Sequence, residues 1–158
     1  MAPQPNFDAF PVPYRAIAAN ILSGDKMVFD HGALAEAMRS SMSIPVVFMP
    51  YSYNGQLLVD GGIVDNLPVD VAKQMGADIV IAVISRGKAP DTLDELNSSV
   101  EIASQTGNIF ISQNMKPNIE AADLVIAEVE NLVNVGEIEP EHVVTPGIFV
   151  DIIVRGCD

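Results

Sequence analysis

The residues best suited to chemistry in this sequence are Asp60, Gly61 and Gly62, which form an Asp-Gly-Gly tripeptide. The tripeptide follows an apolar run, so Asp60 is expected at the carboxyl end of a strand. Open α/β sheets place their ligand sites at such strand ends. The two glycines carry no side chains and let a substrate or another backbone approach the carboxylate closely. A carboxylate in that position can accept a proton from a reacting group.

A turn without chemistry is the alternative interpretation of the same tripeptide. Asp-Gly is a common turn pair, because glycine adopts backbone angles that other residues avoid. A calcium loop is excluded, since Asp60, Asp65 and Asn66 lack the alternating ligand spacing of such loops. The two histidines, His31 and His142, are too few and too scattered for a zinc motif. We therefore predict no bound metal and no cofactor.

Composition and charge exclude several classes of protein. The net charge of -13, from 8 basic and 21 acidic residues, argues against nucleic acid as a partner, since that binding needs a basic surface. No apolar run approaches the roughly 20 residues of a membrane span, and the first residues lack the pattern of a secretory signal. The single cysteine, Cys157, cannot form an internal disulfide, so a cytoplasmic location is expected. The length of 158 residues is that of one globular domain.

The tripeptide lies between a predicted strand and a predicted helix. Residues 56–60 form the strand. Asn66 is expected to cap the helix at its start, and Gly76 to close it. Upstream, residues 14–21 and the following MVF run predict a hairpin. The GALAEAMRSS run, residues 32–41, predicts a short helix with one buried face, made of Leu34, Ala37, Met38 and Ser41. The apolar IPVVFMPY segment contains two prolines and is expected to be extended, with breaks.

Further apolar runs predict parallel strands on the carboxyl side of the tripeptide. Residues 77–85 are fully apolar at the strand centre, as in a strand buried on both faces, and residues 122–129 form a similar run. Thr92 and Glu95 predict a capping box at the start of a longer helix, which lies between these two strands in the sequence. Strands that alternate with helices at this spacing form βαβ units. We therefore predict an α/β fold, three-layer βαβ with a mostly parallel sheet.

An ordered set of motifs resembles the carboxyl-terminal half of the patatin-like phospholipases. The matching pieces are RAIAANILSGDKMVFDHG, SSMSIPVVFMP and DGGIVDNLPV, and the resemblance covers about residues 7–126. It implies a partial patatin-like fold and a lipid acyl hydrolase that cleaves fatty-acyl esters with a serine–aspartate dyad. The family's aspartate falls on Asp60, whose carboxylate would accept the serine proton directly. Gly61 and Gly62 would let the two catalytic elements pack closely.

The serine of that dyad has no counterpart in this sequence. In the family the serine lies in a Gly-x-Ser-x-Gly elbow, and a glycine-rich loop forms the oxyanion hole; both belong to the amino-terminal half. None of the serines here has glycines at both required positions. We therefore name no nucleophile, expect the chain to be inactive alone, and leave open whether it is an enzyme.

The end of the chain resembles a different family. AEVENLV, VGEIEPE and TPGIFVD, within about residues 122–155, are similar to the carboxyl end of a CoA-transferase α subunit of the 3-oxoacid or acetate type. That family carries its catalytic glutamate outside this segment, so no catalytic residue is assigned here. We predict a patatin-like segment over residues 1–126 and a CoA-transferase-like tail over residues 127–158, packed on the same single domain. The GIFVDIIV run is expected to form an edge strand.

Three functions therefore stay open. The chain is a segment of an acyl hydrolase that supplies Asp60 and acts on a lipid or acyl ester, a CoA-transferase-related chain, or a non-catalytic recombined α/β domain. A fragment, a natural fusion and a constructed chimera fit the sequence equally well. Loss of an amino-terminal half would leave an apolar sheet edge, which proteins cover or pair. A partner chain or a homo-oligomer is therefore expected.

Overall fold

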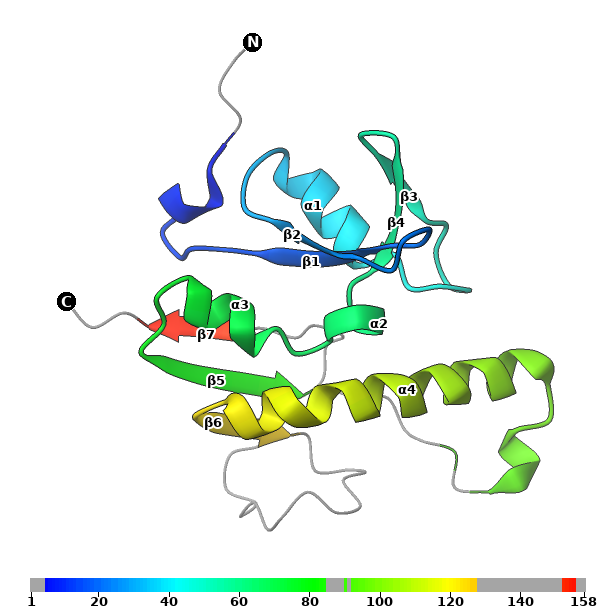
Figure 1. The fold of residues 1–158 in the computed structure, drawn as a ribbon. Helices are drawn as coiled ribbons and strands as arrows, with labels where there is room; N and C mark the ends of the chain where they lie inside the picture. The colour runs from blue at the N-terminus through cyan, green and yellow to red at the C-terminus, as the bar shows by residue number, and fades with distance from the viewer. Residues whose placement is uncertain (1–4, 85–89, 91, 128–151, 156–158) are drawn as a thin grey trace. The chain divides into compact units, whose positions relative to one another are not determined.

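The computed structural model describes residues 5–84, 90, 92–127 and 152–155, and the chain divides into two compact units. The first unit comprises Met1–Asn66 and the second Leu67–Asp158 (Figure 1). The tail boundary predicted at residue 127 is followed by residues 128–151, which lie outside the described residues. That boundary, and the packing of the tail, stay predictions.

The first unit contains a four-stranded sheet in the order β2-β1-β4-β3, and every pair in it is antiparallel. β1 (Ala16–Asn20) and β2 (Lys26–Phe29) form the predicted hairpin, which turns at Gly24 with a φ of 75°. β3 (Tyr51–Tyr53) and β4 (Gln56–Asp60) form a second, tighter hairpin. Because β4 also pairs with β1, it is an inner strand of this sheet.

Helix α1 (Leu34–Ser41) covers one face of this sheet (Figure 1). The predicted helix is confirmed, but its buried face agrees with the predicted one only at Ala37. Ala37 and Ser40 are buried, whereas Leu34 and Met38 are exposed. Small side chains let the helix approach the sheet closely, and the larger ones lie at its sides. The core beneath α1 contains Phe7 from the short helix η1 (Phe7–Ala9), Ala16, Ala18, Phe29, Ala37 and Leu58.

Within the IPVVFMPY segment, residues 45–48 form turns, so the predicted extended conformation is interrupted there. The N–H groups of Val47 and Phe48 both donate to the carbonyl of Ile44, at 3.2 and 2.8 Å. Val46 has a φ of 72°, in the left-handed region that a β-branched residue rarely adopts. Pro45 lies in this turn and Pro50 follows it, and proline fixes φ at about -65°, a value that suits turns as well as extended chain.

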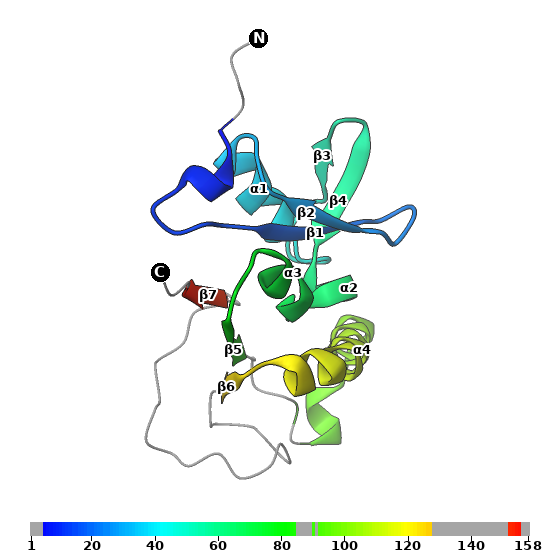
Figure 2. The ribbon, with the colours of Figure 1, turned by 60° about the vertical axis from the view of Figure 1, so that its left-hand side comes forward.

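The second unit contains a three-stranded sheet in the order β6-β5-β7. β5 (Ile79–Ile84) pairs in parallel with β6 (Leu124–Ala127) and antiparallel with β7 (Ile152–Arg155). Helices α3 (Val69–Gln74) and α4 (Ser99–Ala121) lie on the same side of β5 and β6 (Figure 2). β7 is an edge strand of this sheet, as expected for the part of GIFVDIIV that is described.

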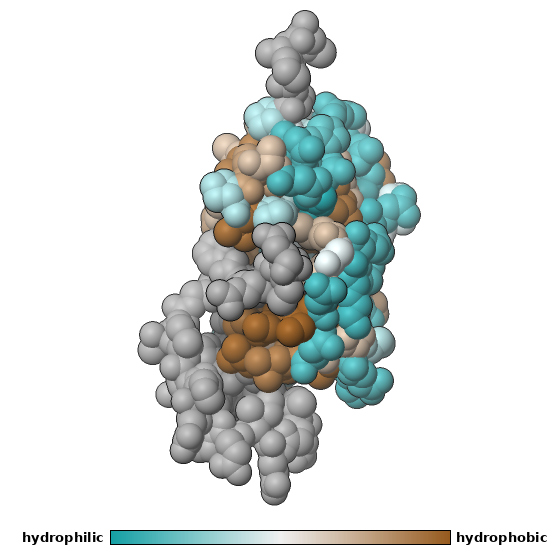
Figure 3. All heavy atoms as spheres, turned by 90° about the vertical axis from the view of Figure 1, so that its left-hand side faces the viewer, coloured by the Kyte–Doolittle hydropathy of each residue, from teal (hydrophilic) through white to brown (hydrophobic). Residues whose placement is uncertain are grey.

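The apolar core of the second unit fills the space between these helices and β5. Its buried members are Leu67, Val69, Ala72, Val80, Ala82, Ile84 and Met115. β5 alternates between buried and less buried residues, so the prediction that it is buried on both faces is wrong among the described residues. Ile79 is 53% exposed, and Leu124 at the start of β6 is 51% exposed. Figure 3 shows apolar atoms exposed over this part of the second unit.

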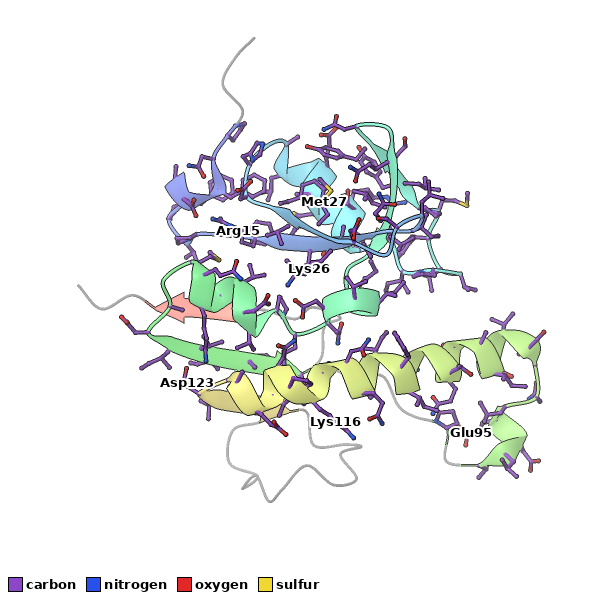
Figure 4. The ribbon with its side chains drawn as sticks, viewed as in Figure 1. Arg15, Lys26, Met27, Glu95, Lys116 and Asp123 are labelled. Atoms are coloured by element: carbon purple, nitrogen blue, oxygen red, sulfur yellow. The ribbon has the colours of Figure 1, made fainter. Side chains whose placement is uncertain are left out.

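The α/β class is confirmed, whereas parallel pairing is limited to β5 and β6 among the described strands. In the first unit tight turns join β1 to β2 and β3 to β4, and such turns connect only antiparallel neighbours, while a parallel pair needs a longer crossover. Helix α4 is the crossover between β5 and β6. Asp123, labelled in Figure 4, fixes its end: its N–H donates to the Val80 carbonyl at 3.0 Å, and its Oδ2 accepts from the Val80 N–H at 2.8 Å.

The capping box of α4 is formed by Ser98 and Glu101, and not by the predicted Thr92 and Glu95. The Ser98 hydroxyl accepts from the Glu101 N–H, and the Glu101 carboxylate accepts from the Ser98 N–H. Thr92 donates only its hydroxyl to the Glu95 side chain, beside the short helix η2 (Leu93–Glu95). No helix in the described part of the chain is long and apolar enough to cross a membrane.

Candidate functional site

Asp60 lies at the carboxyl end of β4, as the sequence predicts. In register it faces Ala18 of β1, and its backbone N–H donates to the carbonyl of Ser43 at 3.0 Å. The side chain of Asp60 is half-buried. The backbone of this residue is therefore held from two sides, by an inner strand and by the segment that follows α1.

The Asp60 carboxylate is held by the backbone two residues further along the chain. Its Oδ1 accepts a hydrogen bond from the Gly62 N–H at 2.7 Å. Burial raises the pKa of Asp60 above its ordinary value, and the Gly62 hydrogen bond opposes that rise. A carboxylate with a raised pKa is a stronger proton acceptor than an ordinary one. The geometry therefore suits a general base with a fixed orientation.

Gly61 and Gly62 are required for space. A Cβ on Gly61 would lie 2.5 Å from the carbonyl carbon of Ile17 and 2.7 Å from its Cγ2. A Cβ on Gly62 would lie 2.5 Å from Oδ1 of Asn66 and 3.0 Å from Oδ1 of Asp60. The backbone of Gly61 is helical, with φ -68° and ψ -19°, so conformational freedom is not the reason for glycine there. The backbone of β1 therefore approaches Gly61 closely, and the side chains of Asn66 and Asp60 approach Gly62. That these glycines let two catalytic elements pack stays a prediction.

A one-turn helix that the sequence did not predict, α2 (Gly62–Asp65), begins directly after this approach. Asn66 ends α2 and does not cap the next helix, because α3 follows Pro68 without a side-chain cap. The prediction for Asn66 is therefore wrong. Local propensity missed α2 because Gly61 and Gly62, poor helix formers, begin it.

Asp65 of α2 forms an ion pair with Lys26 of β2, and sequence reasoning did not assign this pair. The Lys26 Nζ lies 2.8 Å from Oδ2 of Asp65, and Figure 4 shows Lys26 where it extends from β2. The two residues are 39 positions apart. No local signal connects them, since helical and strand periodicities relate only near neighbours.

Ser43 is the serine whose backbone contacts Asp60, but its hydroxyl proton is already in use. The Ser43 hydroxyl donates to the Arg39 carbonyl at 2.7 Å and accepts from the Arg39 Nη1 at 2.6 Å. A serine hydroxyl has one proton to give, and Ser43 is fully buried. Ser43 therefore supports the backbone of the site, and the structure assigns it no role as a nucleophile.

Arg39 also holds the turn segment that follows Ser43. Its Nη2 donates to the Met49 carbonyl at 3.0 Å, and its guanidinium lies over the rings of Phe48 and Tyr51, at 5.6 and 5.9 Å from their centroids. Contacts of this kind stabilise by about 0.5–1 kcal/mol each at exposed sites. The segment beside Asp60 is thus fixed by one arginine.

Asp30 and His31 form a second titratable pair, on the surface of the first unit. The carboxylate of Asp30 contacts Nδ1 of His31, and both side chains are exposed. The hydrogen bond from His31 lowers the pKa of Asp30. In the described ranges, no three histidine, cysteine, aspartate or glutamate side chains are grouped so that they could hold a metal ion.

Two family models match this chain, in different regions. Residues 5–73 match the model of the patatin-like phospholipases, and residues 97–156 match the model of the coenzyme A transferases. The first region contains Asp60, Gly61 and Gly62. Both resemblances predicted from the motifs are confirmed by these matches.

Curated relatives of the NTE family and the patatin-like phospholipases support the first match. An uncharacterized NTE family protein of Mycobacterium tuberculosis is 41% identical over 80 residues, 51% of this chain and 22% of the relative. Patatin-like phospholipase domain-containing protein 7 of Rattus norvegicus is 43% identical over 74 residues, 46% of this chain and 6% of the relative. Lysophospholipase NTE1 of Meyerozyma guilliermondii is 31% identical over 139 residues, 86% of this chain and 9% of the relative.

The chain spans about a fifth of the length of the mycobacterial relatives and less of the others. The alignment with lysophospholipase NTE1 of Meyerozyma guilliermondii covers most of this chain, so it overlaps the region of the coenzyme A transferase match. The resemblance to this lysophospholipase therefore extends over both units.

Proposed function

We propose that this chain is the aspartate-bearing segment of a patatin-like lipid acyl hydrolase, and that Asp60 is the base of its serine–aspartate dyad. The observation that carries the proposal is the half-buried Asp60 carboxylate, which the Gly62 N–H holds at the end of β4. This carboxylate lies within the patatin-like match. A half-buried acid with a raised pKa is typical of a functional group.

In the proposed reaction Asp60 accepts the proton of a serine hydroxyl while the serine oxygen bonds to the ester carbonyl carbon. The ester bond then breaks, and the protonated Asp60 returns that proton to the departing alcohol. Water hydrolyses the acyl-serine by the same two proton transfers. Since Oδ1 of Asp60 is held by Gly62, we assign the proton transfer to Oδ2.

A lipid or acyl ester is the proposed substrate. The turn segment beside Asp60 exposes apolar side chains, with Val46 81% and Met49 80% exposed. The carbonyl of Ser43, which precedes this segment, accepts a hydrogen bond from the Asp60 N–H. This bond connects the backbone of the apolar segment to the backbone of Asp60. Contact of an acyl chain with this surface would bury apolar area and stabilise binding.

The proposed nucleophile lies outside the 158 residues, because no Gly-x-Ser-x-Gly motif occurs in them. We therefore propose that the chain is inactive alone. We propose a patatin-like segment over residues 1–126 and a CoA-transferase-like tail over residues 127–158. We also propose a cytoplasmic location. A partner chain or a second copy is proposed to cover an exposed sheet edge.

A hybrid enzyme tests the proposal. The part of the mycobacterial relative that precedes its match to this chain would be fused ahead of residue 5, and hydrolysis of p-nitrophenyl butyrate would be measured. We expect no hydrolysis by the chain alone and hydrolysis by the hybrid. Asp60→Asn in the hybrid should lower kcat by about 10²–10⁴-fold, the usual contribution of a general base.

Asp8→Asn is the matched control for this assay, because Asp8 is an exposed partner of Arg15. It should leave kcat unchanged. Hydrolysis by the chain alone, or a hybrid that keeps its rate with Asp60→Asn, would contradict the proposal. Light scattering tests the proposed association separately, since a monomer at micromolar concentration would count against it.

A second candidate function rests on the match of residues 97–156 to the coenzyme A transferases. On that proposal the second unit binds CoA together with a glutamate-bearing partner subunit. A ligand that binds only the folded chain raises its melting temperature. A rise in melting temperature with CoA, and none with p-nitrophenyl butyrate, would favour this candidate over the acyl hydrolase.

A further inference from the structure

The ion pair of Lys26 and Asp65 lies on the first unit's sheet, next to the candidate site. The Lys26 Nζ and Oδ2 of Asp65 are 2.8 Å apart, and their side chains are 30% and 8% exposed. A charge buried as deeply as Asp65 is costly unless a partner compensates it. The pair therefore ties β2 to α2.

The register of the sheet explains how Lys26 reaches α2. Lys26 pairs with Ala19 of β1, and Ala19 pairs with Val59 of β4. Residues paired across adjacent strands point to the same face of a sheet. The Lys26 side chain therefore points to the same face of the sheet as Ala19 and Val59. Lys26 lies two strands away from β4, and its long side chain reaches Asp65.

Helix α2 connects that ion pair to the Asp60 carboxylate. The N–H of Asp65 donates to the Gly61 carbonyl at 2.8 Å, which closes the single turn of α2. The same turn presents the Gly62 N–H to Oδ1 of Asp60. A one-turn helix has little stability of its own, so its place depends on what holds its ends.

We propose that the Lys26–Asp65 ion pair positions α2 so that the Gly62 N–H holds the Asp60 carboxylate. Lys26 and Asp65 are thus positioning residues for Asp60. Their catalytic meaning rests on the proposed function. Their effect on the Asp60 carboxylate does not, and it is measurable without any substrate.

The substitution Asp65→Asn separates positioning from direct charge effects by sign. Removal of the Asp65 charge makes the surroundings of Asp60 more positive, which by itself lowers the pKa of Asp60. Loss of the Gly62 hydrogen bond removes a contact that favours the ionised carboxylate, which raises that pKa. The two effects oppose each other.

The test is the titration of the Asp60 side-chain carbon by ¹³C NMR in the full chain. We expect the pKa of Asp60 to rise in Asp65→Asn and to stay at the wild-type value in Lys26→Arg, which keeps the ion pair. A fall or no change in Asp65→Asn would overturn the proposal. Because no ester is present, failure of the acyl hydrolase proposal would not alter this result.

Amide exchange in Lys26→Met is the second measurement, in case Asp65→Asn does not fold. The Gly62 amide should exchange about tenfold faster than in the wild type, as expected for one lost hydrogen bond. The Asp60 amide, which donates to the Ser43 carbonyl, is the internal control and should keep its rate. Equal acceleration of both amides, or of neither, would overturn the proposal.

Discussion

The two units of this chain differ in where they place polar groups. In the first unit a half-buried carboxylate, a nearly buried ion pair and an arginine with four partners surround the ends of antiparallel strands. In the second unit the described buried residues are all hydrophobic, and they lie between two helices and a strand. The patatin-like match contains all of the first unit's described strands, whereas the coenzyme A transferase match lies wholly in the second unit.

This difference shows that the parallel strand–helix–strand unit and the candidate site lie in different units of the chain. The parallel pair β5 and β6, which gives the α/β character, carries no residue of the candidate site. The site lies instead where a hairpin strand ends and a glycine pair lets the backbone approach β1. Four sets of substitutions would break or sharpen the contrast, and their expected effects decrease in order.

Truncation of each core should give the largest effects. Leu58 and Leu67 are both fully buried, one in each unit. Leu58→Ala and Leu67→Ala should each cost about 2–5 kcal/mol, because a cavity is left behind. Hydrogen exchange should show loss of protection at Ala18 with the first substitution and at Val80 with the second. Equal losses at both amides in both variants would show that the contrast between the units does not extend to their stability.

Alanine at two glycines should have opposite effects in the two units. Gly61→Ala would place a Cβ against the backbone of Ile17 and should destabilise the first unit by about 1–3 kcal/mol. Gly107, within α4, has open space around its Cβ position, so Gly107→Ala should stabilise by about 0.5–1 kcal/mol. Urea denaturation would measure both changes. A tolerated Gly61→Ala would contradict the close approach at the candidate site.

The capping box of α4 should contribute less than either core. Ser98→Ala removes the acceptor for the Glu101 N–H and should cost about 1 kcal/mol. Thr92→Ala is the matched control, because the Thr92 hydroxyl contacts only an exposed carboxylate and should change stability by less than about 0.5 kcal/mol. The two midpoints of thermal unfolding compare them. A larger effect of Thr92→Ala would restore the capping box predicted from the sequence.

Asp60→Asn should give the smallest change, and its sign depends on pH. Since the pKa of Asp60 is raised in the folded chain, the folded state binds more protons than the unfolded state above pH 3.8, until the raised pKa is passed. Stability from this group is therefore present below that window and is lost as pH rises through it. Asparagine avoids the loss and keeps an acceptor for Gly62. The variant should match the wild type in melting temperature at pH 3.5 and exceed it at pH 7; a lower melting temperature at pH 7 would contradict this.

Local signals predicted the elements of the fold but not the way they are paired. The Ser-Gly-Asp turn predicted the β1–β2 hairpin, and the GALAEAMRSS run of residues 32–41 predicted α1, which begins two residues later than that run. The apolar runs predicted β5, the described part of β6 and the crossover between them. The antiparallel pairing of β4 with β1 was not predicted, because it joins segments about 40 residues apart and leaves no periodic trace in either.

The candidate site was predicted only in its central residue and its glycines. Asp60 was recognisable from its place between strand and glycines and from the resemblance. The support around it was not, since Lys26, Asp65 and Ser43 come from separate elements and meet only in the folded chain. Asn66 was misassigned because asparagine occurs both before the first turn of a helix and at the end of a helix, and here it ends α2.

The most direct test of the central claim is the titration of Asp60 in the wild-type chain. The claim is that the first unit holds Asp60 as a half-buried carboxylate suited to accept a proton. The side-chain carbon of Asp60, followed by ¹³C NMR and assigned by comparison with Asp60→Asn, should titrate above the ordinary value of 3.8. A titration at or below 3.8 would contradict the account, because Asp60 would then be an ordinary turn residue.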